Sequence, residues 1–287
     1  MIHDEGYLWI TIHLMNYQTY PPSADLNAMV KCHWTLEVPP LPEAPKQRII
    51  PDGCIEMCFI LGEDVRRYTT ETEYILQPRA MVFGQITRPY FVQPTGYVNT
   101  FAVRFYPYGF ANMIDQPISE LADQETALAS LFGKESAKVL EQKIIAATTT
   151  EQRIQAVEGF LLGRLADQGV QDTIVQSTVL ALAKTKGKAT IKALLKEDPS
   201  KRRSLERKFS KQVGISPKQL GKIIRLQAAL KSMLNNQEET LTRIAYESDY
   251  YDQAHFIKDF KELTGTNPSD YLDDEQMILS TLIYSKE

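Results

Sequence analysis

The side chains best suited to binding chemistry in this sequence are basic and lie at helical spacing. Arg203 and Arg207 are four residues apart, so a helix would present them on one face. Ala254, Lys258 and Lys261 lie at positions i, i+4 and i+7 of a later helical segment. Such faces contact the phosphates and bases of a nucleic acid in some proteins and form ordinary solvated surface in others. The helices that carry these residues, and their surroundings in the chain, indicate whether the faces bind nucleic acid or are solvated surface.

Charge is distributed unevenly along the chain. The net charge of the 287 residues is −4, of which residues 1–183 carry −8, residues 184–272 carry +7 and the last fifteen carry −3. Between residues 200 and 231 there are ten Lys and Arg residues and one acidic residue, Glu206. A basic module joined to an acidic one favours contact between the basic part and a polyanion.

Two copies of one pattern surround the basic faces when the chain is shifted by 51 positions. The aligned pairs form an apolar stripe, a terminal glycine and a cap followed by proline: Leu205 with Phe256, Phe209 with Phe260, Gly214 with Gly265, and Ser216-Pro217 with Asn267-Pro268. Each apolar stripe faces a core and leaves the basic side chains opposite. A shorter helix precedes each copy, over 190–197 or 240–247. The repeat therefore predicts two helix-turn-helix units.

Two C-terminal stretches, 202–230 and 241–272, resemble the DNA-binding domain of AraC-family transcription regulators. The second, LTRIAYESDYYDQAHFIKDFKELTGTNPSDYL, is similar to the family signature over nearly its whole length. The resemblance implies two helix-turn-helix units joined by a long helix over about 217–234. It also implies that their recognition helices enter successive major-groove segments of double-stranded DNA, about 34 Å apart.

The resemblance implies base contacts at six positions: Arg203, Glu206 and Arg207 in the first unit, and Gln253, Ala254 and Lys258 in the second. Arg suits guanine, Gln suits adenine and Ala can touch a thymine methyl group. Glu206 either accepts from cytosine or pairs with a neighbouring Arg. Seven further positions are candidates for phosphate contact, two of them through backbone N–H groups at Ser200 and Asp252: Ser200, Lys201, Arg202, Lys211, Lys218, Asp252 and Lys261. His255 is interpreted as a packed or capping residue.

The first half of the sequence has the composition and turn spacing of a β-rich domain. Runs over 30–38, 53–61, 79–86 and 96–106 are rich in β-branched and aromatic residues and are separated by Pro, Gly, Asp or Asn turns. They predict a β-barrel or a sandwich, and a cupin-like β-barrel is the expected fold. The stretches PDGCIEMCFIL, VFGQITRPYFVQPTG and FAVRFYPYGFANMI also resemble the sensor part of a subgroup of the same family.

The predicted fold class is α+β, with a β-barrel and helices followed by an all-α domain of two helix-turn-helix units. The expected domains are a sensor or dimerisation domain over 1–168, a DNA-binding domain over 169–272 and an acidic tail over 273–287. Helical spacing is expected over 109–115, 127–147 and 151–167 in the first domain. In the second it is expected over 171–185, 190–197, 201–213, 217–234, 240–247, 252–264 and 268–272.

Catalytic and metal chemistry find little support in the sequence. His3, His13 and His33 are well separated and form no H-x-H pair, so no metal and no cofactor are expected. Cys54 and Cys58 share one face of a strand and are interpreted as buried small residues. Nucleotide-binding and hydrolase motifs are missing, so we expect no enzyme. The odd number of cysteines and the lack of a long apolar run predict a cytoplasmic protein without a membrane span.

The remaining role for the N-terminal half is sensing. Arg104 either binds an anionic small-molecule effector or is an edge residue with an exposed head. Trp34, Phe83, Tyr90 and Phe91 either line a pocket or fill the core.

Partners other than DNA follow from the same reasoning. The helices over 127–167 either pair two chains into a homodimer or cover the barrel, and RNA polymerase is a candidate protein partner. The leading interpretation is a sequence-specific transcription regulator controlled by a small molecule. The alternative is a non-enzymatic ligand-binding or protein-interaction scaffold whose DNA binding is non-specific.

Overall fold

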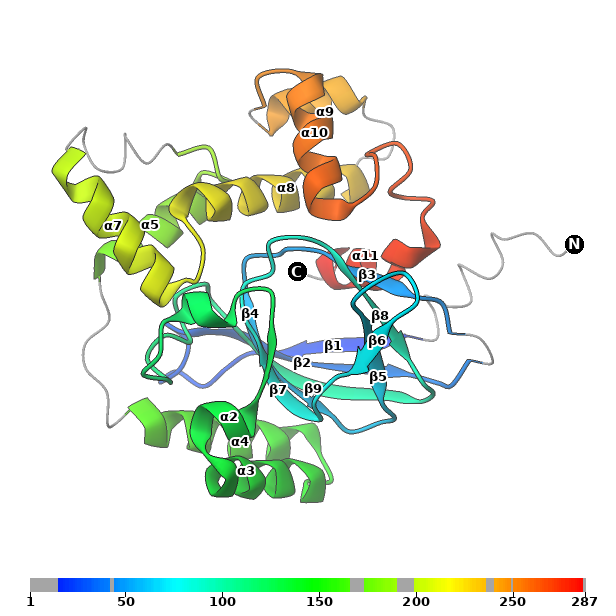
Figure 1. The fold of residues 1–287 in the computed structure, drawn as a ribbon, viewed down its shortest axis with the longest axis vertical. Helices are drawn as coiled ribbons and strands as arrows, with labels where there is room; N and C mark the ends of the chain where they lie inside the picture. The colour runs from blue at the N-terminus through cyan, green and yellow to red at the C-terminus, as the bar shows by residue number, and fades with distance from the viewer. Residues whose placement is uncertain are drawn as a thin grey trace, which may run out of the picture.

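The computed structural model describes residues 15–41, 44–165, 173–189, 199–235, 240–248 and 250–285. A β-rich N-terminal part is packed beneath a helical C-terminal part, and three further helices lie on the far side of the strands (Figure 1). The arrangement is the α+β class that the sequence predicts.

Two antiparallel sheets build the N-terminal part. The six-stranded sheet has the order β1 (Asn16–Tyr20), β2 (Val30–Val38), β9 (Val98–Phe105), β4 (Ile55–Ile60), β7 (Ala80–Phe83) and β10 (Glu125–Ala127). The four-stranded sheet has the order β3 (Gln47–Ile49), β8 (Tyr90–Pro94), β5 (Val65–Tyr68) and β6 (Tyr74–Leu76). The four strands predicted from sequence are β2, β4, β7 and β9, which are the inner strands of the larger sheet.

Alternation along β4 gives this sheet two different faces. Ile55, Met57 and Phe59 are buried in a core shared with the helices outside the barrel. Glu56 and Cys58 point to the opposite side, where they line a cavity between the two sheets. Successive side chains of a strand point to opposite faces, so the sequence of β4 fixes both environments at once. The result is a cupin-like barrel with a hollow interior.

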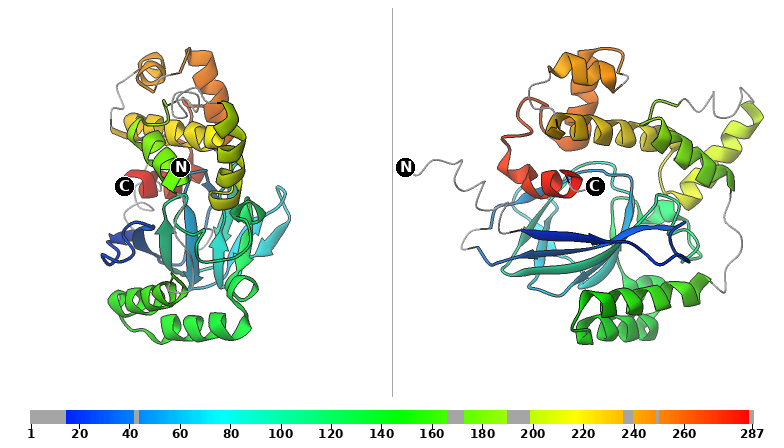
Figure 2. Two further views of the ribbon diagram at one scale, coloured as in Figure 1. Left: turned by 90° about the vertical axis from the view of Figure 1, so that its left-hand side faces the viewer. Right: turned by 180° about the vertical axis from the view of Figure 1, so that it is seen from behind.

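Three helices cover the outer face of the six-stranded sheet: α2 (Leu128–Phe132), α3 (Lys134–Ala146) and α4 (Thr150–Leu165). Their buried faces, among them Leu140 and Leu161, join the core formed by β4 and β9. His33 of β2 reaches Glu158 of α4, with 2.9 Å between Nε2 and Oε1. The helices predicted over 127–147 and 151–167 are therefore present, and one of their faces covers the barrel (Figure 2).

The helix expected over 109–115 is not present, and that prediction is wrong. The segment forms hydrogen-bonded turns, in which Gly109 N–H donates to the Tyr106 carbonyl and Met113 N–H to the Phe110 carbonyl. A Cβ atom at position 109 would lie 2.1 Å from the Met29 carbonyl oxygen, so the chain passes too close for a side chain there. Phe110 and Met113 are buried in the barrel core, and their spacing reflects that burial. The first helical element among the described residues is the 3₁₀ turn η1 (Ile118–Leu121).

Helices make up most of the described C-terminal part. Its elements are α5 (Thr173–Lys184), α7 (Pro199–Gln212), α8 (Pro217–Asn235), α9 (Leu241–Glu247), α10 (Gln253–Thr264), η2 (Glu275–Met277) and α11 (Ile278–Ser285). The helix expected over 190–197 lies outside the described residues. The helix expected over 268–272 is wrong, because these residues form turns that place Tyr271 against Phe260, with 5.5 Å between the ring centroids.

The internal repeat is visible in the folded chain. Gly214 and Gly265 follow α7 and α10 with φ angles of 91° and 77°, a region open to glycine at little cost. The capping box predicted at Ser216 and Gln219 forms reciprocally, with 3.2 Å from Gln219 N to Ser216 Oγ and 3.1 Å from Ser216 N to Gln219 Oε1.

The N-terminal barrel and the C-terminal helices pack against each other. Ile50, which directly follows β3, belongs to the same buried cluster as Ile223 and Leu226 of α8. Gln227 of α8 donates to the Pro51 carbonyl at 2.6 Å. Beyond α10, the segment expected as an acidic tail over 273–287 is folded between 275 and 285, where η2 and α11 pack against β3 (Figures 1 and 2).

Candidate nucleic-acid interface and barrel cavity

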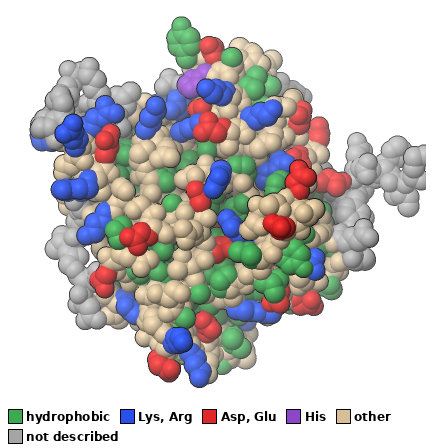
Figure 3. All heavy atoms as spheres, viewed as in Figure 1, with side chains coloured by type: hydrophobic (Ala, Val, Ile, Leu, Met, Phe, Trp, Pro, Cys, Tyr) green, Lys and Arg blue, Asp and Glu red, His purple; other side chains and the backbone are tan. Residues whose placement is uncertain are grey.

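The two faces of α7 differ as the sequence predicts. Leu205 and Phe209 are fully buried, whereas Arg203, Glu206 and Arg207 are exposed. Figure 3 shows Lys and Arg side chains gathered at the end of the molecule where α7 lies. In the described structure Glu206 pairs with a neighbouring Arg: Arg202 Nε donates to its Oε1 at 3.0 Å.

The second basic face lies on α10. Phe256 and Phe260 are buried, and Gln253, Ala254 and Lys258 are exposed. The Asp252 carboxylate caps the helix by accepting the His255 N–H at 2.7 Å. His255 also packs against Tyr250 in a T-shaped arrangement, with 5.4 Å between centroids, although its side chain stays about half exposed. Since the Asp252 carboxylate occupies the helix N-terminus, a phosphate approaching the backbone there would meet a negative charge.

The remaining candidates for phosphate contact lie around these two helices. Those with described side chains are all exposed: Lys201, Arg202 and Lys211 on α7, Lys218 on α8 and Lys261 on α10. Ser200 lies in the first turn of α7, and its side chain is outside the described part of the chain. Helix α8 connects the units, and α7 and α10 lie apart along it (Figure 1). The structure thus brings the candidates together as two separate basic faces.

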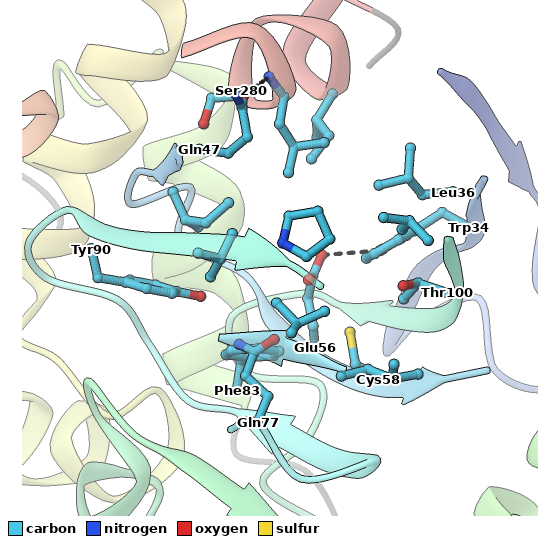
Figure 4. A pocket seen from close by; sticks show the side chains of 18 of the residues that line it. Trp34, Leu36, Gln47, Glu56, Cys58, Gln77, Phe83, Tyr90, Thr100 and Ser280 are labelled. Carbon is cyan, nitrogen blue, oxygen red and sulfur yellow. Dashed lines mark hydrogen bonds between the residues drawn. The ribbon is translucent and has the colours of Figure 1, made fainter. Parts of the chain in front are cut away.

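The inside of the barrel holds a cavity of about 180 Å³ between the two sheets (Figure 4). Its walls are mostly apolar and come from both sheets and from α11, which contributes Leu279, Ser280 and Ile283. Trp34, Phe83 and Tyr90 line this cavity, and Trp34 also belongs to a buried apolar cluster against which Phe83 packs.

Arg104 is buried inside the barrel and is not an edge residue with an exposed head. Its side chain is 3% exposed, and its Nε donates to Glu56 Oε1 at 2.6 Å. Asp52 Oδ2 lies 3.5 Å from Arg104 Nη2, and Trp34 Nε1 donates to the same Glu56 oxygen at 3.1 Å. Buried charges are tolerated when they are paired in this way.

The cysteines of the barrel are held in the thiol form. Burial, followed by the charge of Asp52, raises the pKa of Cys54 to about 12, and burial raises the pKa of Cys58 well above its ordinary value. Reactivity requires the thiolate, and burial disfavours that form here. Within the described ranges, three or more His, Cys, Asp or Glu side chains nowhere gather in a metal-binding arrangement. No helix among them is long and apolar enough to cross a bilayer.

The cavity residues Glu56 and Asp52 were not singled out from sequence. Glu56 lies between Cys54 and Cys58 in a strand of otherwise apolar residues. Alternation places it on the same face as the two cysteines, and a lone carboxylate on an apolar face is the signal that could have identified it.

The comparisons with known proteins agree with this geometry. A family described as a helix-turn-helix domain matches residues 200–274, and a domain of unknown function (DUF6597) matches residues 18–127. No curated protein sequence is significantly similar to the chain. The first of these matches, together with the two basic helices, identifies a helix-turn-helix domain in the C-terminal part of the chain. The helix-turn-helix domain is of the AraC type, as the C-terminal resemblance predicts.

Several solved structures are similar to the chain as a whole or in part. ToxT from Vibrio cholerae is 11% identical with a TM-score of 0.46, covering 90% of this chain and 98% of that one. ToxT from the same organism bound to (E)-4-(8-methylnaphthalen-1-yl)but-3-enoic acid is 12% identical with a TM-score of 0.46, covering 91% and 99%. The cupin domain of an XRE family regulator from Enterobacter cloacae is 15% identical over 33% of this chain and 98% of that one, with a TM-score of 0.25.

Proposed function

We propose that the chain is a bacterial-type, sequence-specific DNA-binding regulator whose activity is controlled by a small molecule in the N-terminal barrel. The observation that carries this proposal is the pair of equivalent helices α7 and α10. Each buries an apolar stripe and exposes Arg or Lys on the opposite side. Two such helices suit two successive major-groove segments on one side of a duplex. DNA binding places the proposed activity in the cytoplasm.

In this proposal the two helices read bases and the surrounding side chains hold phosphates. The base-reading set remains Arg203, Glu206, Arg207, Gln253, Ala254 and Lys258. Glu206 holds Arg202 in the free protein, and the pair would have to separate before the carboxylate could accept from a cytosine. Phosphate contacts come from exposed lysines such as Lys218 at the start of α8. They position the protein without specifying a sequence.

The proposed division of the chain follows the sequence boundaries, with a sensor domain over 1–168 and a DNA-binding domain over 169–272. Apolar side chains on the outside of α3 and α4 support a homodimer formed through the sensor domain. Val139 is 49% exposed and Ile145 is 70% exposed, and neither is needed to cover the barrel. A dimer suits repeated half-sites on DNA, and RNA polymerase is a further candidate partner.

Control by a small molecule is supported by the way the cavity wall meets the DNA-binding helices. Asp52 and Cys54 line the cavity and flank Gly53, which packs against side chains of α8. A Cβ atom on Gly53 would lie 3.0 Å from Leu220 Cδ1, and the neighbouring Pro51 carbonyl accepts from Gln227. A ligand that moves the loop around Gly53 therefore changes the surface against which α8 packs. Differential contacts of that kind are what coupling between two sites requires.

Base-reading and phosphate-holding residues are distinguished by single substitutions. On a duplex recovered by selection, Arg207→Ala and Lys258→Ala should each cost about 1–3 kcal/mol, with little effect on random DNA. Lys218→Ala should weaken both duplexes alike. Fluorescence anisotropy on the selected and random duplexes measures all three variants. Equal losses on both duplexes for all three variants would contradict base reading.

That contradictory outcome favours the alternative function, a scaffold that binds DNA without sequence preference. A scaffold would show a steep salt dependence shared by all duplexes, since counterion release depends on the number of phosphate contacts and not on the bases. A regulator shows the same salt slope together with a preferred site.

A further inference from the structure

The charged groups of the barrel cavity leave it with a negative balance. Among the described residues that line it, the charged ones are Asp52, Glu56 and Arg104, which are two carboxylates and one guanidinium. Arg104 is held by both carboxylates, at 2.6 Å from Glu56 and 3.5 Å from Asp52. Its positive charge is therefore already compensated inside the protein. A ligand carboxylate would meet one excess negative charge in a mostly apolar site, where repulsion is stronger than in water.

Glu56 is the carboxylate that faces the part of the cavity where a ligand would lie. Its side chain projects from β4 toward the middle of the cavity (Figure 4). The hydrogen bonds that described residues make to it, from Arg104 and Trp34, both end on Oε1. The second oxygen, Oε2, is thus left to accept a hydrogen bond from a molecule in the cavity. A carboxylate positioned by two fixed donors on one oxygen is well oriented to receive a donor on the other.

Three other polar side chains of the wall form hydrogen bonds within the protein. Gln47 bonds to the η2–α11 segment, Gln77 donates to Glu125 at 2.8 Å, and the Ser280 hydroxyl donates to the Arg48 carbonyl at 2.7 Å. Tyr90 faces the cavity with its hydroxyl group (Figure 4). Burial raises the pKa of Tyr90 well above its ordinary value, so the phenol stays neutral and is a second hydrogen-bonding group. Most of the remaining wall is apolar.

The size of the cavity limits the ligand further. Its volume is about 180 Å³, somewhat above the roughly 150 Å³ of an apolar cavity that holds benzene. A single ring with a short substituent fits these dimensions, and a long chain does not. Leu279 and Ile283 of α11 line the cavity, so such a ligand would touch the C-terminal helix as well as the barrel.

We propose that the cavity is a binding site for a small, mainly apolar molecule of about one ring that carries a cationic or hydrogen-bond-donating group for Glu56, and that it selects against carboxylates. Arg104 positions Glu56 in this site and does not act as an anion receptor. The inference rests on the proposed control by a small molecule, and it names the chemical class of that molecule.

Isothermal titration calorimetry of the full-length protein with benzylamine, benzyl alcohol and benzoate tests the charge preference, because these probes share a phenyl ring and differ in charge. We expect benzylamine to bind at least about tenfold more tightly than benzoate, with benzyl alcohol between them. Glu56→Gln keeps the shape and removes the charge. It should weaken benzylamine at least about tenfold and leave benzyl alcohol within about threefold. The exposed Glu63→Gln is the matched control and should leave all three affinities unchanged.

If Glu56→Gln does not fold, the affinities of the wild-type protein for the three probes decide the proposal. Benzoate binding as tightly as benzylamine would overturn the charge assignment. Absence of binding by all three probes at millimolar concentration would overturn the site. Ile283→Trp, which fills the cavity from α11, should abolish binding of every probe, and retained binding would place the probes elsewhere.

DNA selection separates failure of this inference from failure of the proposed function. Protein that enriches a DNA motif but binds none of the probes remains a regulator and refutes the inference. Benzylamine binding by protein that enriches no motif supports the inference and counts against the proposed regulator.

Discussion

Substitution of Arg48 by alanine should release the C-terminal helix from the barrel. Arg48 lies on β3 and is 9% exposed. Its Nη1 lies 2.9 Å from Asp274 Oδ2, and its Nη2 donates to Gln276 Oε1 at 2.8 Å. The guanidinium also lies over the Phe91 ring, 5.1 Å from its centroid. The contacts with Asp274 and Gln276 join the barrel to the segment that leads into α11, whereas the contact with Phe91 lies within the barrel.

The expected loss is about 2–3 kcal/mol for the docking of residues 274–285. Hydrogen bonds to charged groups contribute about 1.5–3 kcal/mol each, and removing one partner of a fully buried pair costs about 3–5 kcal/mol. The Asp274 side chain is 19% exposed and can regain water when the segment opens, which keeps the loss below that upper range. The two hydrogen bonds of Gln47 and the bond from Ser280 remain, so the opening is local.

Hydrogen exchange at the α11 amides measures this loss directly. At about 1.4 kcal/mol per factor of ten, we expect exchange in α11 to be roughly 30- to 150-fold faster in Arg48→Ala, with the barrel strands unchanged. Arg79→Ala is the matched control, because Arg79 pairs with Asp64 at 2.8 Å on the surface, where the two side chains are 53% and 44% exposed. The control should change exchange by less than about fivefold. Equal effects of the two variants would refute the assignment of Arg48 as the anchor.

Two further predictions concern the repeat and the barrel. Gly214→Ala should lower the free energy of unfolding by about 2 kcal/mol and Gly265→Ala by about 1 kcal/mol, because both have positive φ but only Gly214 would bring a Cβ atom within 3.0 Å of Ile118; urea unfolding showing the opposite order contradicts this. Burial lowers the pKa of His33, despite its hydrogen bond to Glu158, so stability should fall as pH drops below the ordinary value of 6.5, where the unfolded chain binds a proton that the folded one resists. His33→Gln should flatten the slope of stability between pH 6.5 and the lowered folded pKa, and an unchanged slope there would contradict it.

The elements with strong local signals were predictable from sequence. Residues 30–38 have the alternation and composition of a strand and form β2 over those same residues. The glycines and caps of the repeat mark the ends of α7 and α10, because each needs one backbone conformation that few other residues adopt. These signals are local, and so a single sequence carries them.

The features that sequence analysis missed depend on contacts between distant segments. Helix α11 follows acidic residues and looks like a tail, but its docking depends on Arg48, more than two hundred positions earlier. Strand β3 has three residues and is defined mainly by its pairing with β8. The spacing of Phe110 and Met113 resembles a helix because both are buried, and burial alone does not fix the backbone between them. The cavity exists only because two sheets with short strands face one another.

The measurement that tests the central claim most directly is selection from random duplex DNA, with wild type and Arg207→Ala compared side by side. We expect a bipartite motif for the wild-type protein, with elements about one helical turn apart. Arg207→Ala should alter one element and leave the other unchanged, because α7 and α10 contact separate groove segments. Failure of well-folded wild-type protein to enrich any motif, both alone and with benzylamine present, would contradict the claim that this chain reads DNA sequence.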